Sequence, residues 1–153
     1  MSGFLAIDPG GPVLGWCWYE GGVKALGLSR APKNLKTARE RATYHRGALD
    51  HYYPGRVVCE CMAFRYRGNK TDPQDLIDLN LIAGHLGTEW WTPDEWKGRT
   101  PKEIHQPRIL DRLDPGEKKT VDAFVAATRA KTLVHNAIDA VGLALFAAGR
   151  IKR

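Results

Sequence analysis

The sequence has no long hydrophobic run and few cysteines. No apolar stretch approaches the roughly 20 residues that a membrane-spanning helix needs, and the N-terminus lacks a charged region followed by an apolar core. We therefore expect a cytoplasmic protein. Its three cysteines, Cys17, Cys59 and Cys61, form no C-x-x-C pair, which argues against both a disulfide framework and a zinc site.

Acidic residues are outnumbered. The chain has 23 Lys and Arg against 17 Asp and Glu, which gives a net charge of +6 and a pI near 9.4. This balance favours a polyanionic partner, and nucleic acid fits better than an anionic membrane surface because no membrane segment is present. With 153 residues, 43% of them hydrophobic, the chain can bury one core, so we expect residues 1–153 to form a single domain.

The hydrophobic pattern predicts an α/β fold with a mixed sheet. Three early strands joined by short glycine-containing turns indicate an antiparallel meander, and the later alternation of helices and strands adds parallel strands. Two prolines, Pro101 and Pro107, are expected to break the segment after residue 92 into short helices. The expected strands are at about 3–8, 13–19, 22–28, 56–61 and 88–91, and the longer helices at about 34–52, 72–87, 115–130 and 133–149.

The first candidate site residue is Asp8, in the stretch "FLAIDPGG" at the end of the first strand. Asp, Pro and Gly are all favoured in turns, so Asp8 can be a turn residue. Alternatively, a carboxylate at a strand end, beside glycines that allow a phosphate to approach, can form a metal or phosphate site. This stretch alone leaves both interpretations open.

Two further acids interrupt apolar segments. Glu60 lies inside "VVCECM" and Asp139 inside "AIDAVGLALFAAG". A buried carboxylate must be hydrogen-bonded, ion-paired or metal-bound, and a salt bridge at the strand end is the simpler alternative for Glu60. Taken with Asp8, acids on two strands and a C-terminal helix are typical of a site for two Mg²⁺ ions, which can be about 4 Å apart and hydrolyse a phosphodiester. We expect Mn²⁺ to substitute for Mg²⁺.

A basic and aromatic segment, "FRYRGNK" at 64–70, follows the strand that carries Glu60. Alternating aromatic and cationic side chains can stack on unpaired bases and pair with phosphates, although a solvated loop with incidental charge is the alternative. The candidate DNA-binding residues here are Arg65, Tyr66, Arg67 and Lys70.

Four segments occur in a characteristic order along nearly the whole chain. They are "AIDPG" at 6–10, "VVCECM" at 57–62, "TPDEWKGRTPKE" at 92–103 and "HNAIDAVGLALFAAGR" at 135–150. Together they resemble the RuvC-type Holliday junction resolvases of the RNase H-like superfamily, particularly their short phage-encoded relatives.

The resemblance implies an RNase H-like fold, with a mixed five-stranded sheet flanked by helices. It also implies a homodimer that resolves Holliday junctions and other branched DNA by Mg²⁺-dependent paired nicks. By match to the family motifs, Asp8, Glu60 and Asp139 would be metal-binding carboxylates. Lys97 and Lys102 would contact the DNA backbone near the scissile phosphate.

The chain departs from the family pattern near its last acid. The family usually carries Asp or His three residues before the final Asp, but this chain has Asn136 there and His135 one residue further back. Both offsets lie on the same helix face as Asp139. His135 can bind a metal or carry a proton, whereas Asn136 offers only a carbonyl oxygen. A helix-terminal histidine and an N-cap asparagine are the structural alternatives.

Other function classes remain open at this point. Actin-like ATPases have a related first turn, but their architecture needs two such domains and this chain has room for one. An RNase H-like nuclease that acts on RNA or on flaps with a single site is harder to distinguish from a junction resolvase. So is a branched-DNA-binding protein without catalytic activity.

Overall fold

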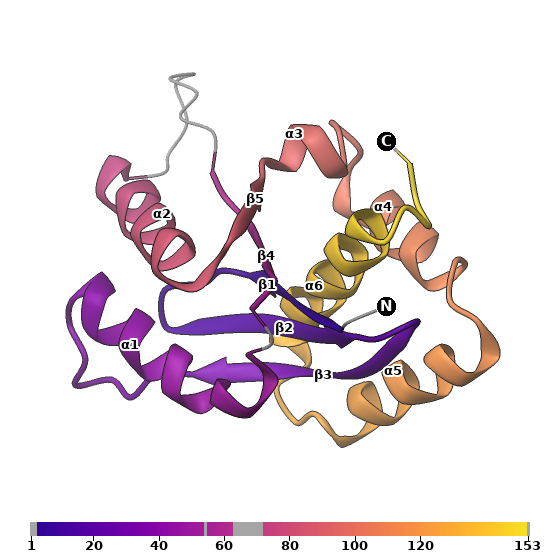
Figure 1. Ribbon diagram of the computed structural model, residues 1–153, viewed down its shortest axis with the longest axis horizontal. Helices are drawn as coiled ribbons and strands as arrows, with labels where there is room; N and C mark the ends of the chain where they lie inside the picture. Colours follow the sequence, from indigo (N-terminus) through magenta and orange to yellow (C-terminus); the bar gives the residue numbers. More distant parts are fainter. Residues whose placement is uncertain (1–2, 54, 63–71, 153) are drawn as a thin grey trace.

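A five-stranded sheet forms the centre of the protein, as seen in a computed structural model that describes residues 3–53, 55–62 and 72–152 (Figure 1). The strand order is β3-β2-β1-β4-β5. The first three strands are antiparallel, whereas β4 pairs parallel to β1 and β5 parallel to β4, which confirms the predicted mixed sheet. The strands are β1 (Phe4–Asp8), β2 (Val13–Tyr19), β3 (Val23–Arg30), β4 (Val57–Glu60) and β5 (Glu89–Trp91).

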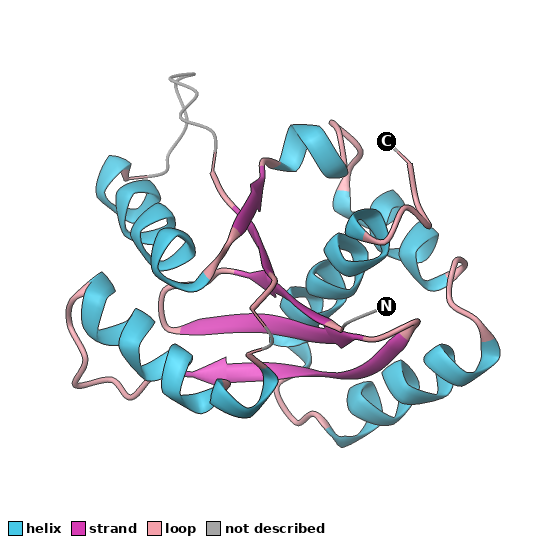
Figure 2. Cartoon of the chain, in the orientation of Figure 1, coloured by secondary structure: helices cyan, strands magenta, loops and turns pink. Residues whose placement is uncertain are grey.

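Helices cover both faces of the sheet (Figure 2). One group, α1 and α2, packs together over one face, and α6 crosses the other face in contact with β1 to β4, accompanied by α4 and α5. None of the helices in the described part of the chain has the length and apolar character that spanning a bilayer requires. The helices are α1 (Ala38–Ala48), α2 (Pro73–Leu86), α3 (Pro93–Trp96), α4 (Lys102–Leu110), α5 (Pro115–Ala127) and α6 (Val134–Ala147), with 3₁₀ turns at Asp50–Tyr52 and Lys131–Leu133.

Strand alternation divides the core into two clusters. In β1, Leu5 and Ile7 pack with α1 and α2, whereas Phe4 and Ala6 pack with α6. Because successive side chains of a strand point to opposite faces, the next even-numbered residue of β1 is directed to the α6 face. In β4, Val58 belongs to the α6 cluster, so the face covered by α6 also receives the last residue of that strand.

Two helices differ from their predicted extent. The helix expected at 34–52 begins only at Ala38, because Thr37 and Glu40 form a reciprocal capping box that starts the helix there. The predicted break at Pro107 is wrong, because α4 continues through it. Because proline has no N–H group, α4 lacks one backbone hydrogen bond at Pro107. Ile109, fully buried in the cluster around α6, stabilises the remainder of α4 by packing.

A close contact between α6 and β2 depends on Gly15. A Cβ atom at this position would come within 2.0 Å of the backbone carbonyl oxygen of Asn136, in the first turns of α6. Since backbone atoms cannot move aside without moving the helix, only glycine permits this approach. Gly15 therefore allows the N-terminal half of α6 to lie directly against the sheet.

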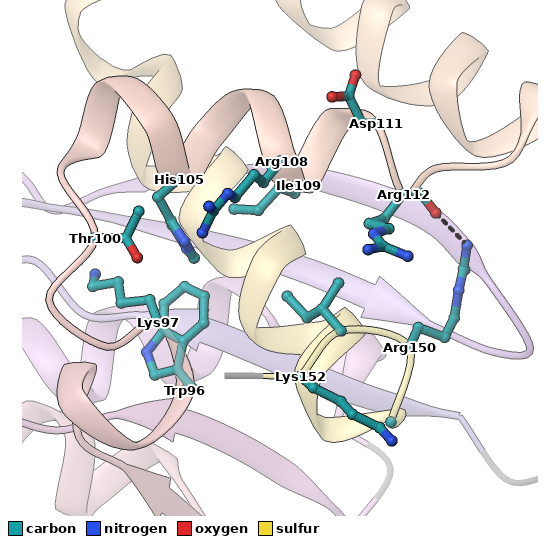
Figure 3. A pocket seen from close by; sticks show the side chains of 12 residues that line it. Trp96, Lys97, Thr100, His105, Arg108, Ile109, Asp111, Arg112, Arg150 and Lys152 are labelled. Carbon is teal, nitrogen blue, oxygen red and sulfur yellow. Dashed lines mark hydrogen bonds between the residues drawn. The ribbon is translucent and has the colours of Figure 1, made fainter.

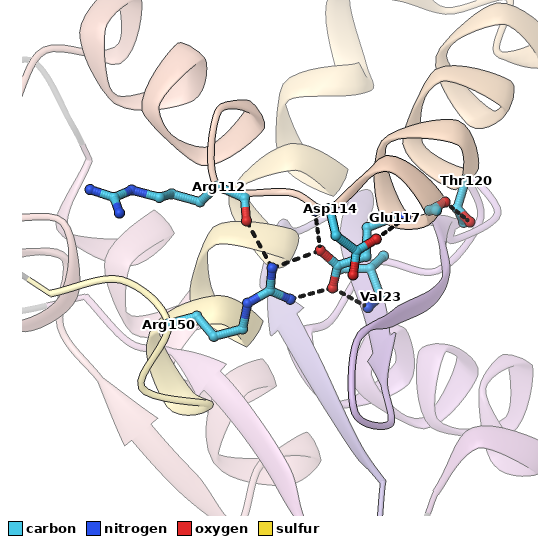
Figure 4. A network of polar contacts seen from close by, with 7 residues as sticks. Val23, Arg112, Asp114, Glu117, Thr120 and Arg150 are labelled. Atoms are coloured by element: carbon cyan, nitrogen blue, oxygen red, sulfur yellow. Dashed lines mark hydrogen bonds and ion pairs between the residues drawn. The ribbon is translucent and has the colours of Figure 1, made fainter.

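A buried carboxylate, Glu117, ties α5 to the sheet and to the segment after α6 (Figure 4). It accepts hydrogen bonds from the backbone N–H groups of Val23 and Asp114, both at 2.9 Å, and forms an ion pair with Arg150. Burial alone would raise the pKa of Glu117, but the hydrogen bonds from Arg150 and the two N–H groups outweigh it and hold the pKa below its ordinary value.

We expect Glu117→Gln to lower the free energy of unfolding at pH 7 by about 2 kcal/mol, because it leaves Arg150 without its charged partner at a partly exposed position. The pKa of Glu117 is lower in the folded than in the unfolded state, so its stabilisation is present above the ordinary value of 4.5 and is lost as the pH falls through the folded-state pKa. The free energies of unfolding of wild type and variant, measured with urea, should therefore converge below the folded-state pKa of Glu117. The exposed Glu20→Gln is the control, and a difference that stays constant down to pH 3 would contradict this account.

Candidate active site

The three candidate acids lie on elements that meet at one end of the sheet. Asp8 is the last residue of β1 and Glu60 the last residue of β4. The parallel register pairs Ile7 with Cys59, so one residue further along it sets Asp8 beside Glu60, and both point to the face covered by α6. Asp139 lies on α6 and is 4% exposed, while Glu60 is 2% exposed. The chain thus collects acidic side chains at the carboxyl ends of two parallel strands.

A lysine ammonium lies between two of these acids. Nζ of Lys97 is 2.9 Å from Oε2 of Glu60 and 4.0 Å from Oδ2 of Asp139. Burial alone would lower the pKa of Lys97, but attraction to Glu60, its hydrogen bond to that carboxylate, and the charges of Asp139 and Asp8 together raise it above its ordinary value. Lys97 is therefore a protonated cation whose pKa is raised by all three acids.

Two neutral side chains fix the orientation of the buried carboxylates. The indole Nε1 of Trp96 donates a hydrogen bond of 2.7 Å to Oε2 of Glu60. Nε2 of Gln106, on α4, donates to Oδ1 of Asp139 at 3.2 Å. Both donors are neutral, so they orient the carboxylate oxygens without adding positive charge to the site.

The short helix α3 brings Trp96 and Lys97 to this place. Thr92 and Glu95 form a capping box around its start, and Pro93 occupies the first turn, where its missing N–H costs nothing. Trp96, the last residue of α3, is 1% exposed and packs in the core cluster around α6. Because α3 ends there, Lys97 emerges directly over the acids.

The three predicted metal-binding carboxylates share one cation, Lys97, which was predicted to contact DNA. Its ammonium lies beside Glu60 and Asp139, and the charge of Asp8 adds to theirs in raising its pKa. The alternative of a salt bridge for Glu60 also holds, but its partner Lys97 is shared with Asp139 rather than private to Glu60. Asp8 is the last residue of β1, and the turn to β2 is formed by the residues after it. Asp8 is therefore a strand residue rather than a turn residue.

The two candidates for a fourth position, His135 and Asn136, lie in the first turns of α6 and are half-buried. Asn136 is not an N-cap, because Leu133 holds that position. The backbone carbonyl of His135 lies 3.5 Å from Nε2 of Gln106, the same group that donates to Asp139. This shared donor ties the start of α6 to the acid cluster, and the choice between the two side chains stays a prediction.

Several predicted DNA-binding side chains fall outside the described part of the chain. These are Arg65, Tyr66, Arg67 and Lys70, together with the side chain of Lys102, whose backbone begins α4. Their roles stay predictions.

The chemistry of the cluster suits a hard divalent cation. Mg²⁺ prefers carboxylate oxygens, and Glu60 and Asp139 already share a positive charge, the ammonium of Lys97. Among the residues that the structure describes, no group of three or more His, Cys, Asp and Glu side chains is assembled as a metal site. The donor type and the negative charge fit the ion, and Lys97 stands where a bound cation would compete with it.

Sequence reasoning missed three residues of this region. Trp96 is a core residue, and the sequence does not predict its hydrogen bond to Glu60. Gln106 and His105 were not singled out. The capping pattern "TPDE" before Trp96 was the available signal, since it marks where a helix begins and which residues end its first turn.

Comparison with known proteins supports the fold. No family model and no curated protein matches the sequence. Among solved structures, T. thermophilus RuvC in complex with a Holliday junction substrate superposes with a TM-score of 0.63 at 19% identity and covers 99% of both chains. Another T. thermophilus RuvC structure gives 0.50 at 19% identity, covering 95% of this chain and 93% of that one.

A viral protein shows the same likeness. The Fowlpox virus resolvase in complex with substrate Holliday junction DNA gives a TM-score of 0.58 at 14% identity, covering 95% of this chain and 99% of that one. At such identities the similarity concerns the fold. This chain has the RNase H-like fold of the RuvC and poxvirus resolvases.

Proposed function

We propose that this protein is a Mg²⁺-dependent endonuclease that resolves Holliday junctions and other branched DNA. The observation that carries the proposal is that Glu60 and Asp139 flank one half-buried cation, Lys97, with Asp8 at the adjoining strand end, on a resolvase fold. The two similar proteins bound to Holliday junction DNA support the class of substrate. The link to short phage-encoded relatives, and a bacterial or phage-infected cytoplasm as the place of action, belongs to the same proposal.

In this proposal Asp8, Glu60 and Asp139 hold two Mg²⁺ ions, and Mn²⁺ substitutes. When bound, the ions supply an activated water and stabilise the leaving oxygen of the phosphodiester. Trp96 and Gln106 keep the carboxylates in a fixed orientation, so little reorganisation accompanies binding. Lys97, released from Glu60, pairs with a phosphate of the bound strand.

We further propose that the protein acts as a homodimer. Three apolar side chains lie exposed at one edge of the fold: Ile77 and Leu81, one turn apart on α2, and Trp90 on the edge strand β5. Trp90 also donates a hydrogen bond to the carbonyl of Ala83, which joins the two elements into one surface. A four-way junction has two equivalent strands to cut, and a two-fold dimer places identical sites on both.

Cleavage of end-labelled substrates tests the proposal. We expect the protein to cut a four-way DNA junction in Mg²⁺, to leave linear duplex intact, and to cut nothing in EDTA. Preferential cleavage of an RNA–DNA hybrid or a flap would favour the single-site nuclease. Tight junction binding without cleavage in either Mg²⁺ or Mn²⁺ would favour a branched-DNA-binding protein.

The fourth position gives a second test. We expect His135→Ala to slow junction cleavage by about 100-fold, as removal of a general acid or base does, and Asn136→Ala to slow it less. Imidazole is both the stronger metal ligand and the better proton carrier. Single-turnover rates of both variants at saturating enzyme provide the comparison. If Asn136→Ala is the slower variant, the amide oxygen is the functional group and His135 is structural.

A further inference from the structure

A basic trough adjoins the acid cluster. A cavity of about 830 Å³ lies between α4 and the residues that follow α6, with Trp96 and Lys97 at one end (Figure 3). Within the described residues, Asp111 is the one acidic side chain that lines it. The cations of this trough are Lys97, Arg108, Arg112, Arg150 and Lys152.

One buried polar side chain, His105, lies in the wall of the trough. His105, on α4, is 7% exposed and packs edge-on against Trp96, with ring centroids 5.0 Å apart. Its Nε2 has no hydrogen-bond partner among the residues that the structure describes. A buried polar group without a partner costs about 1–3 kcal/mol. Such a group in the wall of a basic cavity is accounted for if a ligand atom provides the missing hydrogen bond.

The cations of the trough are not equivalent. Arg150 is engaged in the ion pair with Glu117 and serves the fold. Arg108, Arg112 and Lys152 have exposed side chains. Arg108 lies on α4, Arg112 lies just after α4, and Lys152 lies in the segment after α6. Figure 3 shows them spread along the trough rather than gathered at a single point. Cations at separate places around the cavity match a chain with repeated negative charges better than they match one small anion.

The trough is continuous with the acid cluster through two residues. Trp96 and Lys97 line the cavity, and both contact Oε2 of Glu60. A strand whose phosphate lies at the acids therefore meets the Lys97 end of the trough next.

We propose that this trough binds successive phosphates of the DNA strand that continues from the cleaved phosphodiester. This inference rests on the proposed nuclease function and adds the path of the strand. Arg108 and Lys152 pair with the phosphates, and Nε2 of His105 hydrogen-bonds to a phosphate oxygen close to the cut. By holding the phosphates that follow, the trough determines which phosphate of the strand lies over the acids.

The salt dependence of junction binding tests the trough. The double variant Arg108→Gln/Lys152→Gln should reduce the slope of log K against log salt by about 1.8, at about 0.9 for each lost phosphate contact on duplex DNA. The matched control is Lys33→Gln/Arg39→Gln, which removes the same charge from exposed positions before and in α1, on the opposite face of the sheet. It should leave most of the slope intact. All four side chains are exposed, so melting curves should match wild type.

Neutral phosphates locate the contacts. A methylphosphonate placed one to three phosphates from the cut should weaken binding to the wild type at one position at least, but should add little further loss in the double variant. Equal slopes for the double variant and the control, or equal methylphosphonate effects in wild type and double variant, would overturn the proposed path. Millimolar pyrophosphate is a further probe. If it competes with DNA for the wild type but not for the double variant, and the salt slope of the double variant is unchanged, the trough is a small-anion site and the proposed path is wrong.

Wild-type behaviour separates this inference from the proposed function. If the wild type binds and cuts junctions but the trough variants bind as the control does, only the strand path is wrong. If the wild type neither binds nor cuts branched DNA, the function and the path are both wrong.

Discussion

Replacing Asp8, Glu60 or Asp139 by its amide, as Asp8→Asn, Glu60→Gln and Asp139→Asn, is expected to abolish junction cleavage while leaving junction binding nearly intact. Each substitution keeps the shape of the side chain and removes a negative charge from the cluster around Lys97. Loss of residues that merely support metal ligands already costs about 10–100-fold, so loss of a ligand should cost about 100-fold or more. Affinity depends mainly on phosphate contacts elsewhere and should change little.

Single-turnover cleavage and equilibrium binding, measured on the same junction, give the two quantities. The exposed Asp122→Asn on α5 is a matched control, because it removes one carboxylate without touching the cluster. Melting curves establish that each variant is folded. An acid whose amide still supports cleavage at the wild-type rate in Mg²⁺ does not belong to the active site.

Replacing Lys97 should separate metal binding from catalysis. Lys97→Met removes the cation that Glu60 and Asp139 share and leaves two buried carboxylates close together. Breaking a buried ion pair costs about 3–5 kcal/mol, and since the Lys97 side chain is 21% exposed we expect the lower end, about 3 kcal/mol, in EDTA. A divalent cation no longer has to displace the ammonium, so Mg²⁺ or Mn²⁺ should bind more tightly than to the wild type.

Calorimetric titration with Mn²⁺ and thermal melts with and without Mg²⁺ measure this effect without any DNA. The variant should gain more thermal stability from the metal than the wild type does, because a ligand stabilises the folded state according to its affinity. Cleavage should nevertheless fall, since Lys97 is needed at the phosphate. Unchanged or weaker Mn²⁺ binding by Lys97→Met would show that the ammonium and the metal occupy separate places.

Much of the fold follows from short-range patterns in the sequence. Strand-forming apolar runs in β1 and β2, with turn residues between them, predict the antiparallel meander, and the structure confirms it. The helix extents were less predictable. The start of α1 depends on the Thr37 capping box, and the continuation of α4 through Pro107 depends on the burial of Ile109 against α6. A local rule about proline cannot include that packing.

The acids of the candidate site were accessible to sequence reasoning because charge inside an apolar segment is costly and stands out. Their supporting residues were not. Trp96 donates to a carboxylate 36 positions away, and Gln106 to one 33 positions away. Neither pairing has a local signature, because each exists only after α3 and α4 pack against α6. Lys97 was identified by resemblance to a family, and its place between two acids is a property of the folded chain.

Cleavage of a supercoiled plasmid that extrudes a cruciform tests the central claim most directly. A two-site enzyme that uses these acids should convert the plasmid to linear product in Mg²⁺, by symmetric nicks on opposing strands within one binding event. Asp139→Asn should leave the plasmid supercoiled. Nicked circles without linear product would contradict paired resolution, and linear product from the Asp139→Asn variant at the wild-type rate would contradict the assignment of the active site.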